Sequence, residues 1–236
     1  MLRTVLFDLD GTLLPMDQEE FVNAYFGPLT RRAAPHGYDA EKLIDTLLRF
    51  IAAVPKNDGS RTNYELFWSL MARCFGETAR NDEALFEEFY RTDFWLARKA
   101  CGFAPQAKEV IDLLKAHGIR CVLATNPIFP AIATQTRIQW AGLSPADFEY
   151  ITTYENSCYA KPNPAYFQDV LAHIGCRADE CLMVGNDAVE DTAASEVGIP
   201  VFLVTDCLIN SDGRDVSGHL AGDFDHLLSY LRAELS

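Results

Sequence analysis

The sequence predicts an α/β fold in which helices cover both faces of a mostly parallel sheet. Three observations support this prediction. An apolar segment at 3–8 has the length and character of a buried strand. After residue 102, strand-like and helical segments alternate regularly, a pattern typical of parallel sheets. Between these two regions, from about residue 17 to residue 100, only helical signals occur, which indicates an inserted helical bundle.

The helical segment carries four candidate N-caps, each a side chain that can accept a hydrogen bond from the first helical turn. Two of them are followed three residues later by glutamate, the pattern of a capping box. Apolar residues at helical spacing follow each cap. The caps are Asp17, Asp39, Thr62 and Asn81, and the predicted helices span 21–33, 43–54, 64–75 and 84–95.

In the alternating region, four of the predicted helices are followed by glycine, which favours the turn that ends a helix. Segment 3–8 would supply the first strand of the same sheet. We therefore expect a core made of residues 1–15 and 101–236 and an all-helical cap at 16–100. The predicted helices of the core span 105–117, 131–141, 164–174, 188–197 and 225–232, and its later strands span 119–124, 148–153, 181–184 and 200–204.

Composition limits the classes of function. The chain of 236 residues has 20 Lys or Arg and 34 Asp or Glu, so its formal net charge is −14. This excess of acid argues against a nucleic-acid or membrane-surface partner, because phosphate backbones and anionic lipids require a basic face. Seven scattered cysteines lack the spacing of a zinc site, and no segment is apolar enough to span a bilayer. We expect a cytoplasmic protein with a small-molecule partner; the oligomeric state stays open.

Polar side chains directly follow several of the predicted strands. In open α/β sheets ligands bind outside the carboxyl ends of the strands, so these residues are expected to meet at one site. They are Asp8, Asp10 and Gly11 after the first strand, Thr125 and Asn126 after the second, Lys161 in a loop before a helix, and Asn186, Asp187 and Asp191 after strand 181–184.

These residue types suit the hydrolysis of a phosphate monoester. That reaction needs a nucleophile, a proton for the leaving alkoxide and neutralisation of charge. Asp8 can attack as a carboxylate, but an anion that approaches a phosphate requires a cation, and Mg²⁺ prefers oxygen ligands. Asp8 and Asp187 can supply two carboxylates to that ion. Lys161 can balance Asp8 and a phosphoryl oxygen, and Thr125 can donate a hydrogen bond.

The order and types of these residues resemble the haloacid dehalogenase superfamily of phosphohydrolases. All four motifs of that superfamily are present, and the resemblance covers essentially the whole predicted core. It implies a Rossmann-like three-layer core. It also explains the helical insertion, because many members carry a helical cap between the first motif and the second.

The resemblance also implies a role for each residue. Asp8 would be the nucleophile and a metal ligand, and Asp10 would be the general acid–base, with its backbone carbonyl on Mg²⁺. The expected phosphate-binding residues are Gly11, Thr125, Asn126 and Lys161. Asp187 would ligate Mg²⁺, Asn186 would orient the same loop, and Asp191 would support Lys161 or the metal-bound waters.

Asp10 helps to separate the reactions of this superfamily. An alkoxide leaving group needs a proton and a halide does not, and the superfamily's dehalogenases lack an acid at this position. Asp10 therefore favours phosphoester chemistry. Two alternatives remain: a phosphosugar mutase that uses the same aspartyl-phosphate, and a non-catalytic partner-binding protein, against which intact Asp8 and Asp10 argue.

Two further interpretations concern residues outside the motifs. Glu190 is interpreted as an ordinary acid in a first helical turn, where the helix dipole favours it. Some residues of the cap are expected to face the active site and to choose the substrate. The candidates are Tyr25, Arg31, Arg32, Trp68, Arg73, Trp95 and Lys99.

Overall fold

Six parallel strands form one sheet in the computed structural model, which describes residues 1–236. Their order across the sheet is β3-β2-β1-β4-β5-β6. This confirms the predicted α/β class. The strands are β1 (Thr4–Phe7), β2 (Arg120–Leu123), β3 (Tyr150–Ile151), β4 (Cys181–Gly185), β5 (Val201–Val204) and β6 (Leu220–Gly222).

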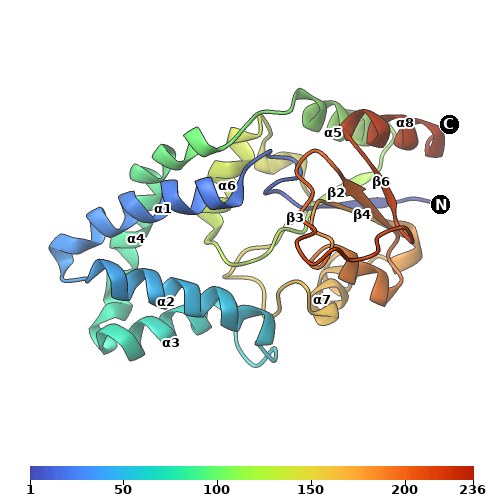
Figure 1. The fold of residues 1–236 in the computed structure, drawn as a ribbon. Coiled ribbons are helices and arrows are strands. Elements are labelled where there is room, and N and C mark those ends of the chain that lie inside the picture. Colours follow the sequence, from blue (N-terminus) through green and yellow to red (C-terminus); the bar gives the residue numbers. More distant parts are fainter.

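Helices cover both faces of this sheet, as Figure 1 shows. Val5 and Phe7 of β1 join the core on the face covered by α5 and α8, whereas Leu6 joins the core under α7. Because β1 is buried on both faces, all four of its residues are fully buried, and the strand is a continuous apolar run apart from Thr4. The covering helices are α5 (Pro105–Ala116), α8 (Phe224–Glu234) and α7 (Pro164–Ile174).

The position of β1 determines where a ligand can bind. Strand β1 lies between β2 and β4, and the chain runs outward from it in opposite directions, through β2 to β3 and through β4 to β6. A crevice forms outside the carboxyl ends of the strands at such a point. Asp8 follows β1 directly and therefore stands at the centre of this crevice.

The segment 16–100 contains no strand and forms a group of helices at one side of the sheet (Figure 1). The chain enters and leaves this group at adjacent points, since Met16 bridges to Cys101 and the Gly102 amide donates to the Pro15 carbonyl at 2.7 Å. The helices are α1 (Gln18–Ala33), α2 (Ala40–Ala53), α3 (Asn63–Phe75), α4 (Glu83–Arg91) and the 3₁₀ segment η4 (Asp93–Ala100).

Three of the four predicted helix caps are confirmed. Asp17, Asp39 and Thr62 each accept a hydrogen bond from the backbone amide three residues later, and Thr62 forms a full capping box. The prediction for Asn81 was wrong. This residue lies inside a 3₁₀ stretch, Glu77–Asp82, and α4 begins only afterwards, without a side-chain cap.

Two other elements differ from the prediction. The segment 188–197 is not one regular helix: it forms turns, in which the Asp187 carboxylate accepts from the amides of Val189 and Glu190, and then the 3₁₀ segment η7 (Thr192–Val197). Strand β6 was missed because it has only three residues, two of them exposed, on the edge of the sheet.

Buried contacts join the helical segment to the sheet region at two places. Phe94 of η4 stacks on Trp140 of α6 (Ala131–Trp140) with ring centroids 5.0 Å apart. On the other side, the fully buried Asn63 side chain donates to the carbonyls of Pro127 and Tyr159, both at 3.2 Å. One hydrophobic cluster therefore continues through both regions. The domain boundary expected between residues 15 and 16 and between 100 and 101 stays a prediction.

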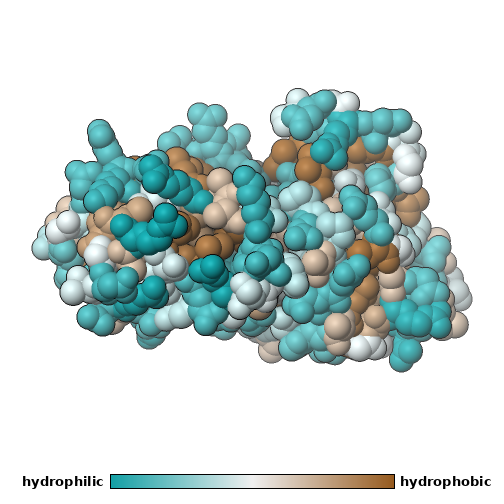
Figure 2. Space-filling model, turned by 90° about the horizontal axis from the view of Figure 1, so that it is seen from below, coloured by the Kyte–Doolittle hydropathy of each residue, from teal (hydrophilic) through white to brown (hydrophobic).

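Most apolar side chains lie in the interior. Figure 2 shows a surface that is mainly hydrophilic, with small apolar patches over both regions. None of the helices combines the length and the apolar character needed to cross a membrane.

Candidate active site

A buried lysine stands between two carboxylates at the carboxyl end of β1. Lys161 Nζ donates to Asp8 Oδ1 at 2.8 Å and to Asp191 Oδ1 at 2.7 Å. All three residues are buried. The structure thus brings together residues from three of the four predicted motifs, although Lys161 lies 153 positions from Asp8 and 30 positions from Asp191 in the sequence.

Asp191 also holds the loop that follows β4. Its Oδ2 atom accepts hydrogen bonds from the amides of Asn186 and Asp187, both at 2.9 Å. This approach requires glycine at position 185, because a Cβ atom on Gly185 would stand 2.1 Å from Asp191 Oδ2. Asp191 therefore fixes Lys161 with one oxygen and the loop with the other.

Asn186 connects this loop to the turn after β1. Its Oδ1 accepts from the Thr12 hydroxyl at 3.0 Å, and its Nδ2 donates to the Cys207 carbonyl at 2.7 Å. Gly11 has a φ of 89°, and a Cβ atom there would stand 2.3 Å from Asn186 Nδ2. The first and fourth motifs are therefore in direct contact. The phosphate contact expected of Gly11 stays a prediction.

Burial dominates the electrostatics of Asp8. It raises the pKa of this carboxyl to about 7, although the charge of Lys161 acts in the opposite direction. Burial also acts to lower the pKa of Lys161, but the charges of Asp191 and Asp8 outweigh it and hold that pKa well above its ordinary value. A charged lysine thus faces two carboxyl groups, which leaves the site short of positive charge.

Asp10 is paired with an arginine that the sequence analysis did not single out. The Arg137 guanidinium is completely buried, binds Asp10 Oδ2 and lies over the Phe129 ring at 4.2 Å from its centroid. Asp10 Oδ1 is buried and has no hydrogen-bond partner. The one sequence signal for this arginine was a lone cation in a helix of small, apolar and neutral polar residues.

The structure corrects the interpretation of Glu190. This side chain lines the cavity in front of Asp8 and accepts a hydrogen bond from Asn126 Nδ2 at 2.9 Å. Burial raises the pKa of its carboxyl to about 8. The prediction that it is an ordinary acid of a helical turn was wrong, because the segment is not a regular helix there and turns this side chain toward the cavity.

A cavity of about 340 Å³ opens in front of these residues. All of the predicted site residues line it except Gly11 and Lys161, which lie behind its wall. Its opposite wall comes mainly from α1, α2 and the loop after Asn126. The catalytic, phosphate-binding and metal-binding roles assigned to individual residues stay predictions.

Of the seven residues of the helical segment expected to face the site, only Tyr25 lines the cavity. Arg31 and Arg32 line a separate depression on the outside of the helices. Trp68 is buried, and Trp95 is exposed beside Trp140. Sequence periodicity could not distinguish these positions, because neighbouring residues on one helix can face the core, the cavity or solvent. Arg73 and Lys99, the last two of the seven candidates, are exposed and do not line the cavity.

The side of the cavity formed by the residues at the strand ends carries the ligand atoms that a hard divalent cation prefers, namely carboxylate and amide oxygens. No three His, Cys, Asp or Glu side chains lie close enough to hold a metal ion by themselves. The expected ligand set does not need three side chains, since it combines Asp8, Asp187 and the Asp10 carbonyl with water. The buried Asp10 Oδ1 atom has no hydrogen-bond partner, which is an observation of this structure that a nearby cation or its bound water would explain. The donor set therefore fits a divalent cation.

The chain is similar to two known phosphatases. The chain is 28% identical over 214 residues to a ribulose-1,5-bisphosphate 5-phosphatase of Halopiger xanaduensis, covering 86% of this chain and 84% of the relative. It is 27% identical over 227 residues to a glyceraldehyde 3-phosphate phosphatase of Methanothermobacter thermautotrophicus, covering 90% and 89%.

The fold also matches solved structures. A 2-haloacid dehalogenase from Pseudomonas syringae superimposes with a TM-score of 0.63 at 18% identity, covering 99% of both chains. At this identity the match shows the shared fold alone. Residues 2–198 match the model of the haloacid dehalogenase-like hydrolases, and the chain therefore belongs to this hydrolase family.

Proposed function

We propose that this protein is a Mg²⁺-dependent phosphatase that hydrolyses a small phosphomonoester through an aspartyl-phosphate on Asp8. The observation that carries this proposal is the contact of Asp8 with Lys161 at the switch point of the sheet, beside a second carboxyl, Asp10, in the same cavity. The two relatives named above are both phosphatases, which supports the same reaction class.

In the first half of the reaction, an Asp8 carboxylate oxygen attacks phosphorus and the bond from phosphorus to the leaving oxygen breaks. Asp10 gives its proton to that leaving oxygen. Thr125 would hold a phosphoryl oxygen, and Lys161 would balance the charge of Asp8 and of the phosphoryl group from behind the cavity wall. A bound cation would supply the remaining positive charge. Asp191 keeps Lys161 in place through the 2.7 Å contact.

In the second half, water attacks the phosphorus of the aspartyl-phosphate and gives a proton to Asp10. The bond between phosphorus and the Asp8 oxygen breaks, which releases phosphate and restores both side chains. Arg137 holds one Asp10 oxygen throughout, so the other oxygen is the one available for proton transfer.

The proposal includes the expected division of the chain, with 16–100 as a cap over a core of 1–15 and 101–236. Cap helices α1 and α2 supply the wall opposite Asp8. The proposed partner is a small phosphorylated metabolite, taken up by an acidic molecule in the cytoplasm.

Asp8→Asn tests the proposal. The purified variant should lose Mg²⁺-dependent release of inorganic phosphate from an aryl phosphate, because the amide cannot form the phospho-intermediate. Asp45→Asn, at an exposed ion pair on α2, is the matched control and should retain activity. Retained turnover in Asp8→Asn would contradict the proposal. Transfer of the phosphoryl group between sugar hydroxyls without phosphate release would identify a mutase instead.

A further inference from the structure

The two walls of the active-site cavity differ in chemistry. Half of its 18 lining residues are hydrophobic, and most of these come from α1 and α2 or from the loop at Ile128 and Phe129. The polar residues lie almost entirely at the carboxyl ends of the strands. Gln18 is the one polar side chain on the helical wall besides Tyr25. A molecule bound at Asp8 by its phosphate would therefore place its organic group against apolar side chains.

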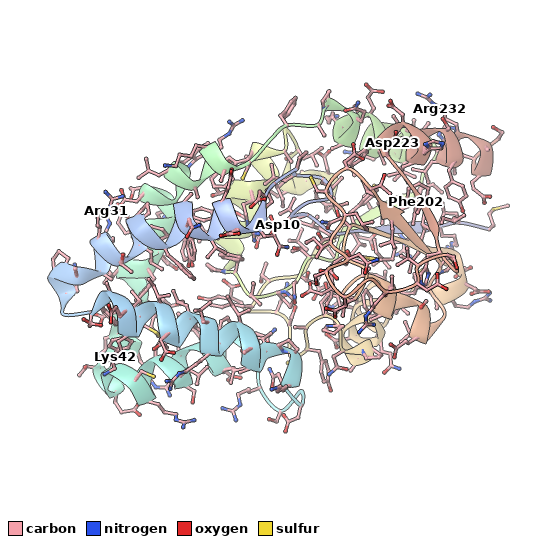
Figure 3. All side chains as sticks on the ribbon, viewed as in Figure 1. Asp10, Arg31, Lys42, Phe202, Asp223 and Arg232 are labelled. Carbon is pink, nitrogen blue, oxygen red and sulfur yellow. The ribbon has the colours of Figure 1, made fainter.

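No lysine, arginine or histidine lines this cavity. Lys161 touches Asp8 from behind the wall and has no exposed surface, and Arg137 is equally buried behind Asp10. In the helical segment, Arg31 and Lys42 lie toward its outer part, away from Asp10 (Figure 3). A second anionic group on the substrate would find no cation here, and Glu190 would repel it if ionised.

The hydroxyl of Tyr25 is not free to bind such a group either. It forms a hydrogen bond with the Tyr90 hydroxyl at 2.8 Å inside the helical region. Tyr25 therefore presents its ring to the cavity, packed edge-on against Phe129 with centroids 5.6 Å apart.

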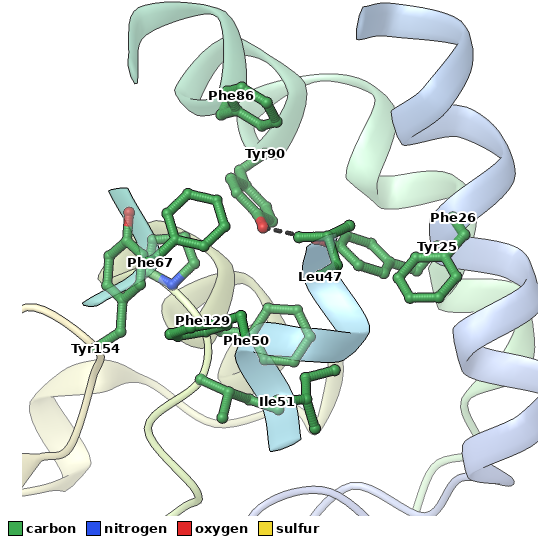
Figure 4. Close-up of a pocket in the computed structure, with 12 residues that line it drawn as sticks. Tyr25, Phe26, Leu47, Phe50, Ile51, Phe67, Phe86, Tyr90, Phe129 and Tyr154 are labelled. Carbon is green, nitrogen blue, oxygen red and sulfur yellow. Dashed lines mark hydrogen bonds between the residues drawn. The ribbon is translucent and has the colours of Figure 1, made fainter. Parts of the chain in front are cut away.

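A second, smaller cavity of about 40 Å³ continues from this wall, and Figure 4 shows its aromatic lining. Eleven of its 12 lining residues are hydrophobic. Tyr25, Phe26, Ile51, Ile128 and Phe129 line both cavities, so the two share a wall. Small shifts of these side chains would extend the active-site cavity into apolar space.

Apolar side chains are also exposed on the wall itself. Val22 is 36% exposed, Leu48 50% and Ile51 40%, and all three line the active-site cavity from α1 or α2. Exposed apolar area gains free energy when a ligand covers it. This wall therefore favours an organic group that is itself apolar.

From these observations we propose that the substrate is a phosphomonoester whose organic group is uncharged and mainly apolar, such as an arylalkyl or branched alkyl group, and carries no second anion. The proposal rests on the phosphatase function proposed above and names its substrate class. It differs from the class named for the Halopiger relative, whose bisphosphate carries a second phosphate.

Three primary alkyl phosphates test the substrate class with the wild-type protein and Mg²⁺: benzyl phosphate, ethyl phosphate and 2-phosphoglycolate. We expect kcat/KM for benzyl phosphate to exceed the other two by about 10-fold or more, since covering one apolar group is worth at least this factor. Turnover of 2-phosphoglycolate equal to or faster than that of benzyl phosphate would overturn the proposal.

Binding measurements separate this inference from the phosphatase function. Calorimetry with Asp8→Asn and Mg²⁺ should show tighter binding of benzyl phosphate than of 2-phosphoglycolate, whether or not the wild-type protein turns either one over. If no phosphate is hydrolysed but this order of affinity holds, the reaction is wrong and the apolar site stands. If hydrolysis occurs with the opposite order of affinity, the inference is wrong and the reaction stands.

Leu48→Arg adds the missing cation at a half-exposed position on α2. It should shift the ratio of kcat/KM for benzyl phosphate over 2-phosphoglycolate by about 10-fold toward the anionic substrate. Leu96→Arg is the matched control, because Leu96 is similarly exposed at 53% but lines the outer depression beside Arg31. Leu48→Gln removes the apolar contact without adding charge and should lower kcat/KM for benzyl phosphate alone. An unchanged ratio in a folded Leu48→Arg protein would overturn the proposal.

Discussion

Asp8→Asn is expected to stabilise the cation-free protein above neutral pH, although it removes the proposed nucleophile. Burial raises the pKa of the Asp8 carboxyl from 3.8 to about 7, and Lys161 only partly opposes this effect. An acid whose pKa is higher in the folded than in the unfolded state binds its proton more tightly when folded. Folding stability therefore falls as pH rises from the lower to the higher of these two values and is constant above both.

The size of the effect follows from the two pKa values. The interval from 3.8 to about 7 corresponds to about 4 kcal/mol, at about 1.4 kcal/mol per pKa unit. Asparagine has nearly the same shape and carries no charge, so the variant escapes this loss. It also removes one of the two carboxylate partners of Lys161, which reduces the gain and makes about 4 kcal/mol an upper value.

Urea unfolding of both proteins in a chelator at about pH 5 and about pH 8 measures this difference. The wild-type protein should lose more stability than Asp8→Asn between the two pH values. Adding Mg²⁺ at the higher pH should then stabilise the wild type more than the variant, because a cation that binds the folded state adds to its stability. Identical pH dependence in the two proteins would refute this account of Asp8. The control Asp45→Asn, at an exposed pair, should follow the wild type.

Three further substitutions test other contacts. Arg137→Met should lower kcat by about 100-fold and destabilise the protein by about 3 to 5 kcal/mol, because the Asp10 carboxylate loses its one buried cation. Steady-state kinetics measure the first effect and urea unfolding the second. Arg137→Lys should recover part of kcat. Asn63→Ala should cost about 1 to 3 kcal/mol in urea unfolding, because two carbonyls lose their donor, whereas the exposed Asn81→Ala should cost almost nothing. Gly185→Ala should abolish turnover, since its methyl group would occupy the space of a buried carboxylate; a variant of full activity would contradict this packing.

Local sequence patterns were sufficient to predict most elements. The helix at 164–174 was predicted with its observed bounds, because proline at its first position and glycine after its last mark both ends. Seven of the nine predicted site residues also line one cavity, since parallel strands bring their carboxyl ends to one edge of the sheet. These features depend on a few neighbouring residues or on the sheet as a whole.

The features that sequence reasoning missed depend on contacts between distant residues. Asp10 and Arg137 are 127 positions apart, and nothing near either residue indicates their pairing. The turns after Asp187 have a helical sequence pattern, but Asp191 binds Lys161 with one carboxylate oxygen and the amides of Asn186 and Asp187 with the other, and no local pattern indicates these contacts. Glu190 was misplaced for the same reason, because its direction follows from those turns.

The charged groups around the cavity give a second argument for the proposed cation. Five carboxyl groups line it, and the two cations that contact them, Lys161 and Arg137, are fully buried behind the wall. A phosphate that entered this cavity alone would meet repulsion and no accessible positive charge. A divalent cation that binds Asp8 would lower the raised pKa of its carboxyl, which makes the nucleophile available, and would also attract the phosphate. On the proposed function, a bound cation would therefore be what lets this acidic site take up a small phosphate.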